Sequence, residues 1–176
     1  ASYIVDQTTA SGSDTYTMYN NAIYTDAVYE VRRSVMRTTS YFAVYMNAQI
    51  YGTSVHRYVG STLESSYGSA ATYTNPPGQG ALCYYYTDSQ FNDNSVLEMD
   101  GNRLYVYRDE AYGLYVRMNG GRIQHRANKY RYGKIAVSYE ATASADNVFE
   151  LEDSTLNEVS VYRPNEHVTS SDLLVV

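Results

Sequence analysis

Turn-forming residues recur at close and even intervals in the second half of the chain, and this spacing constrains the fold more than any other feature. From Ala81 onward, short segments with strand character are separated by turns rich in Gly, Asn and Asp. Many short strands with regular turns are typical of a β-sandwich or a small barrel. We therefore expect a mainly β protein: an antiparallel β-sandwich or small barrel with one N-terminal α-helix.

Two β-hairpins are predicted within this region. The first spans residues 96–107 and turns at Asp100-Gly101-Asn102, and the second spans 113–125 and turns at Asn119-Gly120-Gly121. Glycine supplies the positive φ that a tight hairpin needs. No repeat with a period of 20 to 50 residues is recognised. Further strands are predicted at residues 41–51, 82–86, 134–139, 148–151, 158–162 and 173–176.

One helix is predicted at about residues 20–37. Its apolar residues recur with helical spacing and would share one face: Tyr24, Ala27, Val28, Val31 and Val35. Residues 1–18, rich in Ser, Thr, Gly and Asp, are expected to form an N-terminal arm or an edge strand. Residues 19–176 would then be a single β-rich domain. Residues 60–80 are expected to form a long surface loop, with a short strand near 70–73.

Tyrosine dominates the aromatic residues, with 22 Tyr against three Phe and no Trp. A tyrosine ring packs on a half-buried strand while its hydroxyl reaches water or a partner, so this composition favours sheets with wetted faces or contact surfaces. The single cysteine, Cys83, excludes an internal disulfide framework and a multi-cysteine zinc site. It lies in an apolar segment and is expected to be a small core residue.

Charge is strongly segregated along the chain, although the net charge is only −6. Residues 103–134 hold eight basic and two acidic residues, a local charge of +6. The remainder holds five basic and 17 acidic residues, a charge of −12. Such polarity favours attraction between copies or toward an anionic ligand. An equally weighted alternative is that the two segments are neighbouring strands whose charges pair within one chain.

No catalytic motif is recognised. The histidines His56, His125 and His167 are scattered, and no nucleophile elbow or phosphate-binding glycine loop is present. Asp88, Asp93 and Glu98 flank a polar turn and offer side-chain oxygens to Ca²⁺, but their spacing does not match an EF-hand loop. We therefore expect a protein that is not an enzyme and has no catalytic residue, metal site or cofactor. A carboxylate pair formed only in three dimensions stays open.

Basic and aromatic residues alternate between positions 103 and 132, which indicates a binding or assembly patch. Such a strand surface can stack on rings and contact anions. The overall acidity disfavours nucleic acid, because affinity for a polyanion rests largely on released counterions. A glycan, another anionic surface or a second copy remain as partners. The predicted patch comprises Arg103, Tyr105, Tyr107, Arg108, Tyr115, Arg117, Arg122, Arg126, Tyr130, Arg131 and Tyr132.

These observations favour a non-enzymatic structural subunit that self-assembles into a symmetric or filamentous particle, such as a phage or virus component. Its partners would be copies of itself or other particle subunits, and its location a virion or the extracellular space. No Asn-x-Ser/Thr glycosylation acceptor is present, in keeping with a virion part. The alternative is a secreted module that binds a glycan or lipid headgroup, or a β-rich pore former; a membrane partner belongs to this alternative alone. A helix before a Tyr-rich β body resembles the actinoporin pore formers in outline, with no site residue carried over.

Overall fold

The fold is described by a computed structural model, in which strands account for most of the residues placed. The described residues are 2–6, 9–12, 16–39, 42–66, 80–84, 91–107, 111–132, 134–139, 148–152, 155–157 and 160–162. Over these ranges the protein is mainly β and contains no helix. The expected fold class is confirmed at this level.

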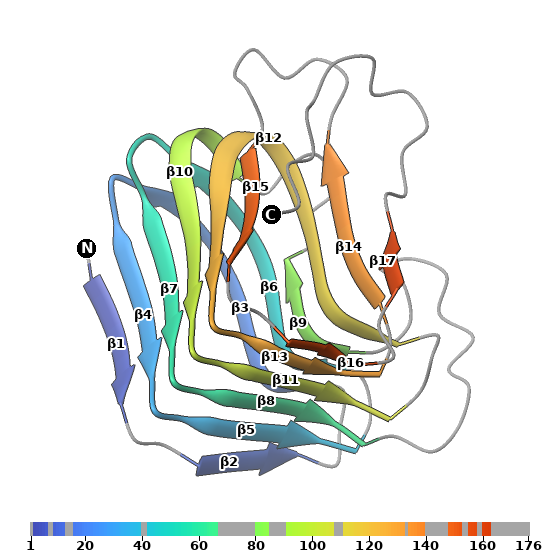
Figure 1. The fold of residues 1–176 in the computed structure, drawn as a ribbon. Coiled ribbons are helices and arrows are strands. Elements are labelled where there is room, and N and C mark those ends of the chain that lie inside the picture. The colour runs from blue at the N-terminus through green and yellow to red at the C-terminus, as the bar shows by residue number, and fades with distance from the viewer. Residues whose placement is uncertain are drawn as a thin grey trace.

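In chain order the strands are β1 (Ser2–Asp6), β2 (Thr9–Gly12), β3 (Tyr16–Thr25), β4 (Val28–Arg32), β5 (Val35–Thr38), β6 (Phe42–Tyr51), β7 (Val55–Val59), β8 (Thr62–Ser65), β9 (Gly80–Tyr84), β10 (Phe91–Asp100), β11 (Arg103–Val106), β12 (Tyr112–Arg126), β13 (Lys129–Arg131), β14 (Lys134–Tyr139), β15 (Val148–Glu152), β16 (Thr155–Asn157) and β17 (Ser160–Tyr162). They form an 11-stranded sheet and a six-stranded sheet. Short corners join β4 to β5, β7 to β8, β10 to β11 and β12 to β13 (Figure 1).

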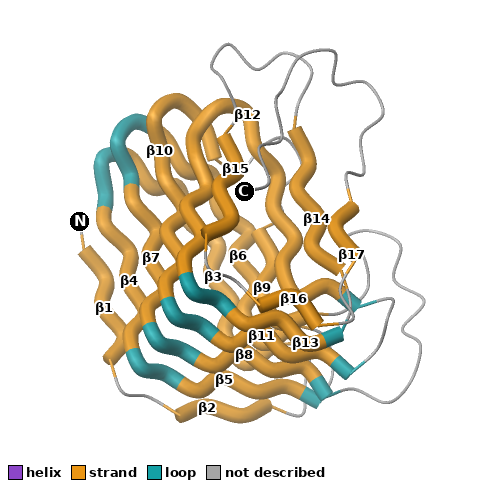
Figure 2. The backbone as a smooth tube through the Cα atoms, in the orientation of Figure 1, coloured by secondary structure: helices purple, strands orange, loops and turns teal. Residues whose placement is uncertain are grey.

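The chain winds through three sides and then repeats, so that each complete turn, or coil, stacks on the one before it (Figures 1 and 2). The first side contains β1, β4, β7, the end of β10, the end of β12 and β15. The second side is the six-stranded sheet of β2, β5, β8, β11, β13 and β16. The third side contains β3, β6, β9, the start of β12, β14 and β17. This winding is that of a parallel β-solenoid.

All strand pairings among the described residues are parallel, so the expected antiparallel sandwich or barrel is wrong for this part of the chain. A solenoid produces parallel pairs because every coil travels in the same direction as its neighbour. From one coil to the next, equivalent residues on the first two sides lie 26 or 27 positions apart in the sequence. The spacing is 41 for the coil that begins with β7, which is longer. The chain therefore has a structural repeat that the sequence pattern did not reveal.

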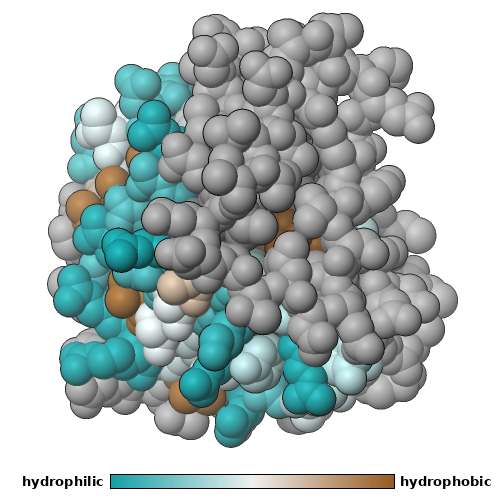
Figure 3. Space-filling model, viewed as in Figure 1, coloured by the Kyte–Doolittle hydropathy of each residue, from teal (hydrophilic) through white to brown (hydrophobic). Residues whose placement is uncertain are grey.

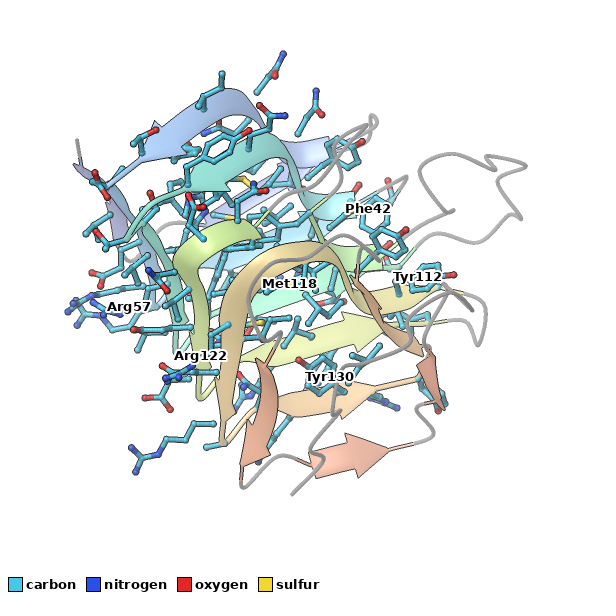
Figure 4. The ribbon with its side chains drawn as sticks, turned by 90° about the horizontal axis from the view of Figure 1, so that it is seen from above. Phe42, Arg57, Tyr112, Met118, Arg122 and Tyr130 are labelled. Carbon is cyan, nitrogen blue, oxygen red and sulfur yellow. The ribbon has the colours of Figure 1, made fainter. Side chains whose placement is uncertain are left out.

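The interior is filled by columns of side chains, one residue from each coil. On the first side the column is Tyr29, His56, Leu97 and Ile123; on the second it is Met36, Leu63, Leu104 and Tyr130; on the third it is Val44, Leu82, Leu114 and Ile135. All of these side chains are buried. Each buried large apolar side chain stabilises the fold by about 1.5–3 kcal/mol. Figure 4 shows Met118 and Tyr130 inside the coils and Arg57 and Arg122 outside.

Residues with positive φ recur at two of the three corners, and between the second and third sides Tyr132 has a φ of 56°. Between the first and second sides they are Arg33, Gly60, Gly101 and Ala127, with φ of 45°, 58°, 63° and 52°. Between the third and first sides they are Asp26, Gly52, Asp93 and Gly121, with φ of 48°, 64°, 56° and 76°. The left-handed conformation bends the chain into the next side without reversing it.

Both predicted hairpins are wrong for this reason. Gly101 turns the chain from β10 into β11, and these strands lie in different sheets. Gly121 lies inside the continuous strand β12, which bends there from the third side to the first. The glycines do supply positive φ, as expected, but each conformation serves a corner. The flanking segments then pair with neighbouring coils and not with each other.

The predicted helix is also wrong, because residues 20–37 form part of β3, all of β4 and part of β5. Corners at Asp26 and Arg33 interrupt the alternation of buried and exposed residues. Each interruption shifts the next apolar residue, so strand segments produce spacings of three and four that imitate a helix. Val28, assigned to the apolar helix face, is 39% exposed.

Several predicted strands are confirmed. Residues 134–139 coincide with β14, and the predicted strand at 41–51 corresponds to β6. Alternation within β6 predicts that Phe42 shares one face with Val44, Met46, Ala48 and Ile50; the last four join the main core, whereas Phe42 does not. Of the alternatives for the N-terminal residues, β1 is an edge strand within the described part, since it pairs with β4 alone. The segments predicted at 70–73 and 173–176 lie outside the described residues.

Phe42 belongs to a second apolar cluster on the outer face of the third side. Its members Phe42, Tyr45, Cys83 and Tyr115 are buried, with Tyr112 packed against them. Strands of this side are therefore buried on both faces, as parallel sheets commonly are. Cys83 is fully buried, as expected, and loss of hydration raises the pKa of its thiol well above the usual value. A neutral, enclosed thiol of this kind is unreactive.

Candidate functional site

The residues of the predicted patch are divided among the three sides. Arg122 and Arg126 are exposed on the first side, whereas Arg103, Tyr105 and Arg131 lie on the outer face of the second side. The patch is therefore not one continuous surface.

The remaining members of the patch lie in other environments. Tyr107 follows β11 and is 47% exposed. Tyr115 is buried in the outer cluster of the third side, Tyr130 is buried in the core, and Tyr132 packs against the core. Arg117 lies in β12 in register with Ser138, and Arg108 lies outside the described residues.

The outer face of the second side has two columns of residues. One column runs Val35, Thr62, Arg103 and Lys129, and the other runs Arg37, Glu64, Tyr105 and Arg131. Neighbouring residues in a column are about 4.8 Å apart and residues two positions apart on a strand about 6.6 Å apart. The register thus brings together residues 26 positions apart in the sequence, such as Arg103 and Lys129.

Glu64 is the acidic residue of this face, and two neighbours bind its carboxylate. Arg37 Nε lies 2.9 Å from Glu64 Oε2, and the Tyr107 hydroxyl donates to Glu64 Oε1 at 3.0 Å. Partial burial raises the pKa of Tyr107, and its hydrogen bond to Glu64 adds to this shift. Tyr107 therefore stays protonated and acts as a donor at neutral pH.

The first side carries a ladder of alternating charges across three coils. Arg57 lies between Glu30 and Glu98: its Nη1 is 3.1 Å from Glu30 Oε2, and its Nε contacts Glu98 Oε2. Arg32 also binds Glu30. The hydrogen bond from Arg32 lowers the pKa of Glu30, and Arg57 adds to the effect. The ladder balances its own charge, so it fits a structural role better than a binding role.

A histidine inside the coils is enclosed by aromatic rings. The ring centroids of Tyr24 and Tyr29 lie 4.5 and 5.0 Å from that of His56, and Phe91 lies at 5.8 Å. His56 Nδ1 is 3.0 Å from the Tyr84 hydroxyl, while Nε2 has no hydrogen-bond partner among the described residues. Burial lowers the pKa of His56 to about 3, so the ring is neutral. Such an enclosed ring cannot meet a substrate from solution.

The three residues weighed for calcium have other roles where they are described. Asp93 Oδ2 accepts a hydrogen bond from the Gly52 N–H at 2.9 Å, and Glu98 pairs with Arg57. Asp88 lies outside the described residues. Within the described segments, no three His, Cys, Asp or Glu side chains gather in a possible metal site. Nor does this part of the chain hold a helix with the length and hydrophobicity that a membrane crossing requires.

Part of the acidic C-terminal segment lies beside the basic segment. Glu150 is in register with Gln124, and Glu152 is in register with Arg126 on the neighbouring coil. Asp100 borders Arg126 from the other side. This register favours the alternative in which the segregated charges are neighbours within one chain.

The described surface in Figure 3 is mostly hydrophilic, with isolated hydrophobic residues. In the described part, the exposed large hydrophobic side chains are Ile23, Val28 and Tyr107. Single residues of this kind are normal on a soluble surface. Charge and hydrogen bonding therefore offer more specificity on this surface than apolar contact does.

The arrangement defines the protein as a parallel β-solenoid, with polar outer faces on its first and second sides where these are described. Comparisons with protein-family models, with curated proteins and with solved structures gave no match.

Proposed function

We propose that this protein is a non-enzymatic structural subunit that self-assembles into a filamentous or symmetric particle, such as a phage or virus component, in a virion or the extracellular space. The supporting observation is the constant parallel register from coil to coil. Each coil presents to its neighbour the same pattern of backbone donors and acceptors. The edge of one copy is therefore complementary to the opposite edge of another.

The first coil illustrates this complementarity. β1 pairs with β4, and no other described strand lies against its second edge. On this side, Val55 N–H donates to Ala27 C=O and Val96 N–H donates to Ser54 C=O, both at 2.8 Å and both toward the preceding coil. N–H groups alternate in direction along a strand. Val55 is aligned through Val28 with Ser2, so the Ser2 N–H points away from β4, and so does the N–H of Ile4 two residues later. The N–H of Val5, the next residue, points toward β4.

The assembly is tested by measuring the molar mass of the purified protein by light scattering at low and high salt, followed by electron microscopy. We expect an oligomer or polymer that persists at high salt, because backbone pairing is screened far less than surface charge. A monomer at every concentration and salt would overturn the proposal. An assembly that dissociates at high salt would contradict pairing through the strand edges and would indicate contacts between surface charges instead.

Two proline variants test the edge directly. Ile4→Pro removes an N–H that faces away from β4, and proline is tolerated on edge strands. We expect a lower molar mass with little change in Tm. Val5→Pro is the matched control, since it removes a donor to β4 and should lower Tm as well. An Ile4→Pro protein with the mass of the wild type would contradict edge pairing.

A further inference from the structure

Four residues on the outer face of the second side form a compact grid. Arg103 and Tyr105 lie on β11, and their register partners Lys129 and Arg131 lie on β13. The side chains of Arg103, Lys129 and Arg131 are exposed, and that of Tyr105 is half-buried. We call these four residues the β11–β13 grid. The Cα atoms of neighbouring cations in the grid lie about 5–7 Å apart along and across the strands, and the diagonal pair Arg103 and Arg131 lies about 8 Å apart.

These cations have no acidic partner in the described part of the chain. Arg103 and Lys129 form no ion pair there, and the residues that flank them in the column are Thr62 and Thr155. The nearby carboxylate of Glu64 is already bound by Arg37 and Tyr107. Arg103 and Lys129 thus lie side by side as like charges.

Like charges opposite each other on adjacent strands are destabilising. An anion placed between Arg103 and Lys129 would relieve this repulsion and accept charge-assisted hydrogen bonds from both. Arg131 contributes a third cation, held 5.2 Å from the centroid of the Tyr132 ring. A contact with an aromatic ring limits the freedom of the guanidinium group, so less entropy is lost when it binds a ligand.

We propose that the β11–β13 grid binds a linear acidic polysaccharide bearing carboxylate or sulfate groups. The grid lies on a parallel sheet whose strands are stacked at a constant spacing, so a chain with repeated anionic groups can contact cations on successive coils. Tyr105 offers both ring surface and a hydroxyl, and Thr62 offers a second hydroxyl, as a hydroxyl-rich ligand requires.

Charge density favours a polysaccharide over duplex nucleic acid. Duplex DNA carries one charge per about 1.7 Å, and binding it usually requires many cations to release counterions. The grid supplies three cations on a chain whose net charge is −6. A polysaccharide with more widely spaced charges is repelled less by the acidic remainder. This inference goes beyond the proposed assembly and does not depend on it.

The test measures fluorescence anisotropy of a labelled heparin fragment with the whole protein at low and moderate salt. Arg103→Gln with Lys129→Gln removes two cations of the grid. Arg122→Gln with Arg126→Gln is the matched control, because it changes the charge by the same amount on the first side. We expect the grid variant to bind at least tenfold more weakly and the control variant less than threefold more weakly. Circular dichroism and Tm check that both variants fold.

Three results would overturn the inference: absence of heparin binding at low salt, equal weakening in the two double variants, or unchanged binding in the grid variant. A labelled DNA duplex and neutral dextran are measured in parallel. DNA that binds as tightly as heparin, and depends on the same two residues, would assign the grid to nucleic acid instead. Light scattering on the same variants reports assembly separately, so that failure of polysaccharide binding and failure of assembly are distinguishable.

Discussion

Asn102 and Asn128 occupy the same corner of consecutive coils, and Asn102 Nδ2 donates a hydrogen bond to Asn128 Oδ1 at 3.0 Å. Both side chains are fully buried. Each amide also binds the backbone: Asn102 Nδ2 donates to Tyr58 C=O at 2.9 Å, and Asn128 Nδ2 donates to Met99 C=O at 2.8 Å. The amides therefore satisfy backbone groups that the bend between sides removes from the strand ladders.

Replacement of Asn102 by alanine should destabilise the fold. Asn102 Oδ1 accepts the Ser61 N–H at 3.0 Å, so Asn102→Ala removes a partner from this donor and from the Tyr58 carbonyl. Loss of partners for two buried polar groups should lower the free energy of unfolding by about 2–4 kcal/mol. Urea denaturation measures the difference. Asn94→Ala is the control, since Asn94 is exposed and should change stability by less than about 0.5 kcal/mol. Equal effects would contradict the role of the buried amides.

Two corner glycines with similar backbone angles should differ in their tolerance of alanine. A Cβ at Gly52 would lie 2.3 Å from Asp26 Oδ1, whereas a Cβ at Gly101 would meet nothing within 4 Å. Gly101→Ala should cost about 1 kcal/mol, the strain of positive φ, and Ala127 already adopts φ 52° at the equivalent corner. Gly52→Ala should cost more, because it also displaces the Asp26 carboxylate from Thr53. Thermal unfolding of both variants checks the order, and a smaller loss for Gly52→Ala would refute it.

His56 should make stability depend on pH below neutrality. Its pKa is about 3 in the fold against 6.5 in the unfolded chain, so the unfolded chain binds a proton that the folded chain excludes. The free energy of unfolding should therefore fall as the pH drops from about 6.5 toward 3, with a slope approaching about 1.4 kcal/mol per pH unit. Above pH 6.5 this contribution is complete and constant. Urea titrations between pH 7 and pH 5 measure the slope before most carboxylates titrate.

His56→Phe is the control for this pH dependence. The variant keeps an aromatic ring beside Tyr29 but has no titrating group, and it loses the hydrogen bond to Tyr84. Its stability at pH 7 should be lower, and its slope between pH 7 and pH 5 should be shallower than that of the wild type. Equal slopes in the two proteins would show that other groups cause the dependence.

Arg57 should contribute more to stability than Arg37, although both bind glutamate. In the first pair the side chains of Arg57 and Glu30 are 35% and 5% exposed. In the second pair those of Arg37 and Glu64 are 56% and 17% exposed. Arg57→Gln removes a cation shared by Glu30 and Glu98 and should cost about 1–2 kcal/mol. Arg37→Gln should cost less than about 0.5 kcal/mol, as is usual for an exposed pair. Urea denaturation of both variants at low salt measures the difference; similar losses would contradict it.

Local strand character could be predicted from the sequence, and parallel pairing could not. Residues 134–139 and the strand that begins at Phe42 were recognised because alternation with a period of two is a property of neighbouring residues. The corner at Gly101 was recognised as a turn. A bend into the next side and a hairpin use the same left-handed residue, and only the partner strand distinguishes them.

The candidate site was predicted in part. Arg103, Tyr105 and Arg131 were identified as patch residues, but so were Tyr115 and Tyr130, which are buried. Whether a tyrosine faces the interior depends on its register within a coil, and the corners that set this register were not recognised. A usable signal was present: a small polar residue directly precedes each of four strands of the second side, at Ser34, Ser61, Asn102 and Asn128.

The sequence by itself determined that this chain forms many short strands with polar outer faces, because side-chain alternation and turn residues act locally. It also determined where positive and negative charges lie along the chain. The tertiary structure alone decided that the strands pair in parallel and that Arg103 meets Lys129. These contacts join residues 26 or more positions apart, and they form because stacked coils bury one common core. A pattern within one coil does not encode that distance, and one longer coil, with a spacing of 41, interrupts its recurrence along the chain.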